Sequence, residues 1–238
     1  MVVLALDTTT RQGSAAVTRD GALLGAFAGD AAITHSQRLP GDLLRLLNAY
    51  DLRISDVDLF AVAAGPGSFT GLRIGIATQQ GLALANDRPL VGVSALDAVH
   101  EATRLARDRE RSCDAMASVG VWMDAQRGQV FSALYSGERV VDGPTAEKPG
   151  DILERWAALV GLADAPCMFA GDGTANYAPL IRGAFPDADI VADVAPLAPS
   201  IARLAEAHAR AHGPSRPDAL RPIYVRRSYA ELTRDRER

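Results

Sequence analysis

The stretch that decides the fold is FAVAAGPGSFTGLRIGIATQQGLALAND, residues 60–87. It begins with an apolar run, passes through the turn Gly65-Pro66-Gly67 and ends in a long helical pattern. A strand, a glycine turn and a helix together point backbone N–H groups and a helix dipole at an anion. The stricter phosphate-binding signatures fail, because Thr70 stands where both a P-loop and a dinucleotide fingerprint require glycine. The glycines therefore indicate only that the backbone approaches something closely.

The helical part of this stretch is apolar around most of its circumference. Gly75 and Gly81 lie in its interior, where each glycine costs roughly 1 kcal/mol relative to alanine. A helix of this kind is normally buried on more than one side. Two interpretations remain open. The helix packs only within its own domain, or it packs on its sheet by one face and on a partner subunit by the other.

The composition is that of an ordinary folded protein. Of 238 residues, 48% are hydrophobic and 23% are charged, and the formal net charge of −4 leaves no overall basic surface for nucleic acid. Cys113 and Cys167 show neither a CxxC nor a metal-ligand spacing. The first residues lack the pattern of a signal peptide, and no apolar run reaches the ~18–20 residues of a membrane span. We therefore expect a cytoplasmic protein that does not contact a membrane.

The chain contains an internal repeat. VVLALDTTTRQGSAAVTRDGA, from Val2, resembles SVGVWMDAQRGQVFSALYSGE, from Ser118, because each joins an apolar run ending in an acid to a polar turn and a second apolar run. This repeat predicts two similar α/β lobes that face each other across a cleft. We place the first lobe at residues 1–108 and the second at 109–215, with a helix near its end over 200–212. Residues 216–238 are expected to form a charged, frayed tail.

The acids of the repeat, Asp7 and Asp124, suggest a phosphate site. A carboxylate at the end of a strand can hold metal-bound phosphate, and the hydroxyls of Thr8 and Thr9 can hydrogen-bond phosphate directly. The same residues are also common turn and cap formers. The candidate nucleotide-binding residues are Asp7, Thr8, Thr9 and Gly65.

The sequence singles out no catalytic residue and no metal ligand. His208 and His212 share a helix face at the spacing of helical zinc sites. They lie in the last helical turn, however, where a histidine complements the helix dipole. No Ser-His-Asp or Cys-His arrangement stands out either. We expect neither a catalytic site nor a metal site.

Six segments occur in the order typical of one family. They are LALDTTTRQGSAAV, HSQRLP, GPGSFTGLRIGIATQQGLAL, PLVGVSALDA, MDAQRGQVF and RPIYVR. On these segments the chain resembles the TsaB (YeaZ) family from residue 1 to about residue 227. The resemblance implies an α/β protein with the duplicated actin/Hsp70-like (ASKHA) fold, in which each lobe has a mixed sheet flanked by helices.

The resemblance also implies a function. TsaB is similar to TsaD, which places a threonylcarbamoyl group on the adenosine next to the anticodon of tRNAs that read ANN codons, forming t6A. In this family TsaB binds and supports TsaD, the small ATPase TsaE joins them, and TsaB also forms a homodimer. The expected consequence is that tRNA is reached only through the complex. ATP, ADP and metal would then belong to TsaD and TsaE, and this chain would have no cofactor of its own.

One departure from TsaD favours a non-catalytic role. TsaD binds its catalytic metal with an HxxxH pair, and the matching segment VSALDAV puts Ala95 and Val99 at those positions. Neither side chain can ligate a metal. Two alternatives remain, an ATP-dependent transferase of the same fold, with a metal site built from Asp7 and Asp124, and a peptidase, since the wider M22 family was once labelled glycoprotease.

The resemblance places the partner interface on the helix after the GPGSFTG segment, where glycines would let a helix of TsaD or of a second TsaB approach closely. The residues predicted for this interface are Gly67, Ser68, Phe69, Thr70, Gly71, Leu72, Arg73, Gly75, Ile76 and Gln79. The tail arginines Arg221, Arg226 and Arg227 are interpreted as part of a solvated end, and their contact with tRNA is left open.

Overall fold

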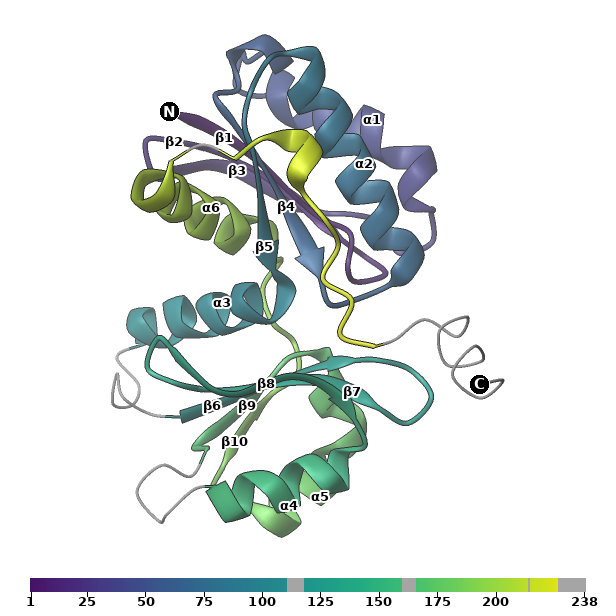
Figure 1. Cartoon of the computed structure of the whole chain (residues 1–238), viewed down its shortest axis with the longest axis vertical. Coiled ribbons are helices and arrows are strands. Elements are labelled where there is room, and N and C mark those ends of the chain that lie inside the picture. The colour runs from purple at the N-terminus through teal and green to yellow at the C-terminus, as the bar shows by residue number, and fades with distance from the viewer. Residues whose placement is uncertain (111–117, 160–165, 214, 227–238) are drawn as a thin grey trace.

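A computed structural model describes residues 1–110, 118–159, 166–213 and 215–226 of the chain. These residues form two lobes, one above the other in Figure 1, and each lobe contains a five-stranded mixed sheet. Among the described residues, no helix has the length and apolar character needed to cross a membrane.

The first lobe is built on a sheet of strand order β3-β2-β1-β4-β5. Its strands are β1 (Val2–Asp7), β2 (Ser14–Arg19), β3 (Ala22–Ala28), β4 (Leu59–Gly65) and β5 (Leu90–Ser94). β1 pairs antiparallel with β2 and parallel with β4, and β4 pairs parallel with β5. The outer face is covered by α1 (His35–Asn48) and α2 (Phe69–Ala85). Since helices lie on both faces, β1 and β4 are buried throughout, which explains their continuous apolar runs.

The second lobe repeats this topology. Its sheet has the order β10-β9-β6-β7-β8, so that β6 to β10 correspond to β1 to β5. The strands are β6 (Ser118–Asp124), β7 (Val130–Ser136), β8 (Arg139–Glu147), β9 (Met168–Ala170) and β10 (Asp189–Val191). Pairing directions also match, with β7 antiparallel and β9 parallel to β6. The helices α4 (Pro149–Leu159) and α5 (Ala178–Ala184) cover the outer face. The predicted duplication, and with it the ASKHA fold, is confirmed.

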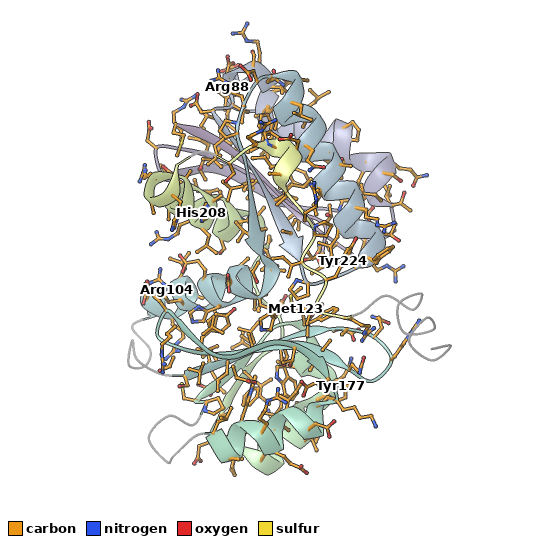
Figure 2. All side chains as sticks on the ribbon, viewed as in Figure 1. Arg88, Arg104, Met123, Tyr177, His208 and Tyr224 are labelled. Carbon is orange, nitrogen blue, oxygen red and sulfur yellow. The ribbon has the colours of Figure 1, made fainter. Side chains whose placement is uncertain are left out.

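Two helices lie between the sheets, α3 (Ala95–Glu110) and α6 (Ala198–His212) (Figure 1). One continuous apolar core joins them to the inner faces of both sheets, and Met123 at the end of β6 belongs to it (Figure 2). α6 packs mainly on β1 and β2, with Ile201 and Ala205 buried there, although it follows the strands of the second lobe in sequence. α6, which lies within the predicted second lobe of residues 109–215, therefore packs mainly on the sheet of the first lobe.

Residues 216–226, expected in a frayed tail, pack on the protein instead. Leu220 packs against the outer core of the first lobe, and the N–H of Ile223 donates to the carbonyl of Ala64 at 2.7 Å. The tail prediction is corrected for this part because its apolar residues find partners on the first lobe. Arg227 and the rest of 227–238 lie outside the described residues, as does Cys113.

Candidate functional site

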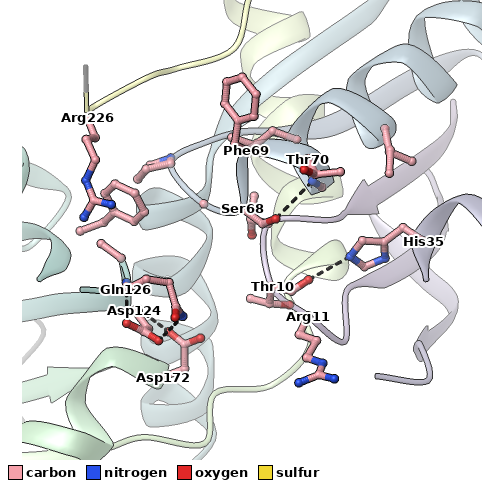
Figure 3. Close-up of a pocket in the computed structure, with 18 of the residues that line it drawn as sticks. Thr10, Arg11, His35, Ser68, Phe69, Thr70, Asp124, Gln126, Asp172 and Arg226 are labelled. Carbon is pink, nitrogen blue, oxygen red and sulfur yellow. Dashed lines mark hydrogen bonds between the residues drawn. The ribbon is translucent and has the colours of Figure 1, made fainter. Parts of the chain in front are cut away.

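A cleft of about 1180 Å³ lies between the lobes, at the carboxyl ends of the central strands of both sheets (Figure 3). This is the place where open α/β sheets usually bind ligands. The first lobe contributes the loop after β1 and the N-terminal ends of α1 and α2. Polar side chains that line the cleft include Thr9, Thr10, Arg11, His35, Ser68, Thr70, Asp124, Gln126, Arg127, Asp172 and Arg226.

Asp7 is turned away from this cleft and into its own loop. Its carboxylate accepts hydrogen bonds from the N–H and the hydroxyl of Thr9, at 2.8 and 2.6 Å, and from the hydroxyl of Thr10 at 3.4 Å. The residue is 2% exposed, and burial raises the pKa of its carboxyl group above the ordinary value, although the Thr9 bonds act in the opposite direction. The sequence left two roles open for Asp7, phosphate binding and turn formation. The hydrogen bonds in this structure are those of a turn former.

Of the other three candidate nucleotide-binding residues, one lines the cleft and two do not. Thr9 lines the cleft, whereas the Thr8 hydroxyl donates to the carbonyl of Gly71 at 2.8 Å and ties β1 to α2. Gly65 (φ +121°) lies beside the carbonyl of Ile223. The structure therefore brings only Thr9 of the four to the cleft.

Replacing Asp7 with asparagine is expected to stabilise the protein at neutral and alkaline pH. Asparagine keeps an acceptor for Thr9 and removes a buried charge. The raised pKa means that the native state of the wild type holds its proton more tightly than the unfolded state does. The wild type therefore loses stability as pH rises through the native pKa, and the advantage of Asp7→Asn should disappear as pH falls below the unfolded value of about 3.9. Urea unfolding of both proteins across this range checks the result. An Asp7→Asn protein that is less stable at pH 8 would contradict it.

The second lobe brings two carboxylates together across the cleft from Thr10 and Arg11 (Figure 3). Asp172 accepts from the N–H of Asp124 at 3.0 Å, and Gln126 donates to Asp124 through its N–H at 2.8 Å and its side chain at 2.6 Å. Burial, and then the charge of Asp124, raise the pKa of Asp172. Sequence reasoning named Asp124 but missed Asp172. The available signal was its position in the glycine turn after β9, which matches the Gly65-Pro66-Gly67 turn after β4.

Two polar side chains on the first-lobe side of the cleft form hydrogen bonds with the backbone of the same lobe. The Ser68 hydroxyl caps α2 by accepting from the N–H of Gly71 at 3.2 Å, and His35 donates from Nε2 to the carbonyl of Thr10 at 3.0 Å. Among the described residues, no group of three or more His, Cys, Asp or Glu side chains could hold a metal ion. His208 and His212 stack on each other at 4.5 Å on the exposed side of α6.

One face of α2 is sealed against the first sheet. The amide of Gln79, which is 0% exposed, donates to the carbonyls of Leu4 and Ala61 at 3.2 and 3.0 Å. Gly71 and Gly75 face Thr8 so closely that neither position has room for a Cβ atom. The predicted interface residues on this buried face are Gly71, Leu72, Gly75, Ile76 and Gln79. In this structure these five residues pack within the chain, and the small size of Gly71 and Gly75 serves contact with Thr8.

The opposite face of α2 is open to solvent. Of the predicted interface residues, Ser68, Phe69, Thr70 and Arg73 are exposed and Gly67 is half-buried. Phe69 is 48% exposed, and the Arg73 guanidinium lies 3.9 Å from its ring centre. The exposed face continues along the helix beyond Arg73. We call Phe69, Arg73, Ala77, Gly81 and Leu84 the exposed stripe.

The positions matched to the HxxxH pair of TsaD lie in the core between the sheets. Ala95 is 0% and Val99 is 3% exposed, and both belong to the apolar cluster around α3. They contribute packing to this core, and neither side chain can ligate a metal.

Comparison with known proteins gives consistent results. Residues 25–230 match the family model TsaD, tRNA N6-adenosine threonylcarbamoyltransferase. The chain is 32% identical over 166 residues to the tRNA threonylcarbamoyladenosine biosynthesis protein TsaB of Escherichia coli, covering 68% of each chain. It is also similar to the structure of YeaZ from Pseudomonas aeruginosa, with a TM-score of 0.73 and 27% identity over 94% of this chain and 99% of that one. A ROK family protein from Streptococcus pneumoniae, with a TM-score of 0.50 and 10% identity over 88% of this chain and 100% of that one, shares the fold alone.

Proposed function

This chain belongs to the TsaB/YeaZ family of t6A biosynthesis proteins, which is related to TsaD, and we propose that it is an accessory subunit that binds TsaD and supports its transfer reaction. On this proposal the modified nucleoside is the adenosine next to the anticodon of tRNAs that read ANN codons. The chain meets tRNA only within the complex, where TsaE joins, and nucleotide and metal are held by TsaD and TsaE.

The observation that carries the proposal is the exposed stripe of α2. The helix already packs on its own sheet through its opposite face, so the fold gives no reason for a second apolar face. Phe69 and Leu84, 48% and 58% exposed, lie at its two ends, with Ala77 and Gly81 between them. Small residues in the middle let another helix approach closely, and exposed apolar side chains favour burial against a partner. The same stripe serves a second copy of this chain in a homodimer that competes with TsaD.

The alternative of an ATP-dependent transferase is less well supported. It needs Asp7 and Asp124 to face one metal, but Asp7 is bonded within its own loop and does not line the cleft. Calorimetry of the purified chain with ATP and magnesium separates the two proposals. Tight binding accompanied by turnover would favour the transferase.

Reconstitution tests the accessory role directly. TsaD and TsaE are purified together with TsaC, a further protein of t6A biosynthesis, and combined with the small substrates of the reaction and an ANN-reading tRNA, with and without this chain. The t6A formed is measured by mass spectrometry of the digested tRNA. We expect t6A to form only with the chain present. Equal formation in both mixtures would contradict the proposal.

A further inference from the structure

Residues 215–226, here called the strap, run along the first lobe towards the second (Figure 1). The side chain of Gln80 on α2 donates to the carbonyl of Pro217 at 2.9 Å. Leu220 occupies the space that a side chain at Gly92 would need, and the N–H of Ile223 donates to Ala64 at 2.7 Å. Backbone and side-chain contacts therefore fix this part of the strap to α2, β4 and β5.

From Ile223 onwards the strap lines the cleft, as Figure 3 shows for Arg226. The ring of Tyr224 lies 5.5 Å from the ring of Phe69, and its hydroxyl accepts from Nε of Arg73 at 3.3 Å. These contacts hold the strap at the first turn of α2, next to the second lobe.

Arg226 then crosses to the second lobe. Its guanidinium donates to Oε1 of Gln129 at 2.5 Å and lies 5.8 Å from the ring centre of Phe131. Gln129 and Phe131 belong to the turn and strand β7 that form the opposite wall of the cleft. Arg226 is half-buried, and burial, followed by the nearby charge of Arg127, lowers the pKa of its guanidinium.

From this geometry we propose that the strap is a latch that holds the two lobes at a fixed separation. The lobes are also joined through α3 and α6, which form the inner core, whereas the strap joins them at the cleft. Opening of the cleft around the inner helices must separate Arg226 from Gln129 or pull Ile223 from Ala64. The latch keeps the chain in one arrangement, and it does so whether or not the proposed function is correct.

The latch is tested by measuring distances between the lobes. Spin labels are attached through genetically encoded keto side chains at Leu44 on α1 and Leu180 on α5, which are exposed, so that both cysteines stay in place. Pulsed electron paramagnetic resonance then gives the distance distribution. We expect one narrow distribution for the otherwise unmodified protein, and a broader one with an added longer distance for Arg226→Ala and for Gln129→Ala.

Arg221→Ala is the matched control. Arg221 lies on the same strap but, among the residues that the structure describes, donates only to the carbonyls of Asp218 and Leu220, so its loss should leave the distribution narrow. A chain ending at Arg226 should also stay narrow, because it keeps every described contact of the strap. Unchanged distributions in both Arg226→Ala and Gln129→Ala would overturn the latch. Equal broadening by Arg221→Ala would overturn it as well, because the effect would then not depend on the contact between the lobes.

Discussion

Replacing Gly71 with alanine is expected to destabilise the protein by about 3 kcal/mol, the upper part of the range for an overpacked site. A Cβ atom at this position would overlap the carbonyl oxygen of Thr8, which is a backbone atom of a fully buried residue. Rotation of a side chain cannot relieve this overlap. The hydroxyl of Thr8 also donates to the carbonyl of Gly71, so α2 and the loop after β1 are tied together where they would have to separate.

Gly81→Ala on the same helix provides the control. A Cβ atom at Gly81 meets nothing within 4 Å. Alanine there should therefore stabilise the helix by roughly 0.8 kcal/mol, through helix propensity alone. Urea unfolding followed by far-ultraviolet circular dichroism measures both variants. If Gly71→Ala proves as stable as Gly81→Ala, α2 does not press on Thr8 as described.

The glycines of α2 show what sequence can and cannot establish about this helix. Its apolar circumference predicted burial on more than one side, and the structure shows one buried face and one exposed face that carries Phe69 and Leu84. The pattern could not tell which glycine lies on which face, because Gly71, Gly75 and Gly81 look equivalent in a helix that is apolar all round. Only the position of Thr8 distinguishes them. Thr8 lies 63 residues before Gly71 in the chain and is brought there by the parallel pairing of β1 with β4.

The two lobes were predictable for a different reason. A strand that ends in an acid and is followed by a turn and a second strand is a local pattern, so its recurrence at Asp7 and Asp124 revealed the duplication. The packing of α6 and of the strap is not local. α6 is amphipathic and would fit either sheet, and the apolar residues of the strap, such as Leu220 and Ile223, are sparse in a charged segment. α6 and the strap pack on the first lobe because the chain crosses back from the second lobe to the first after β10, and no local pattern predicts that crossing.

The cleft itself was predicted from the repeat, but its polar residues were found only in part. Asp124 was identified by its place at a strand end, whereas Asp172 lies in a short turn that carries no periodic signal. Asp7 has the same strand-end position as Asp124 and is likewise bonded within its own turn, by Thr9 and Thr10, but it is buried and does not line the cleft. The local sequence around the two acids therefore did not show which of them faces the cleft.

Replacing Ala77 with arginine is expected to weaken binding to TsaD by at least about 100-fold, or about 2.8 kcal/mol, if the exposed stripe is the docking surface. Ala77 lies between Arg73 and Gly81 in the middle of the stripe, and an arginine there would prevent close approach of a partner helix. Because Ala77 is exposed, its replacement should leave the thermal unfolding midpoint of the free chain unchanged. Isothermal titration calorimetry with TsaD measures the affinity, and sedimentation of the free chain should show the same loss of self-association.

Ala157→Arg on α4 is the control for this measurement. Ala157 is an exposed alanine within a helix of the second lobe, so the substitution adds the same charge and bulk away from α2. It should leave the affinity for TsaD unchanged. Wild-type affinity in Ala77→Arg would exclude the stripe as the docking surface, whereas equal losses in both variants would mean that added positive charge, and not its place on α2, weakens the complex. A loss confined to Ala77→Arg would identify the outer face of α2 as the surface that TsaD buries.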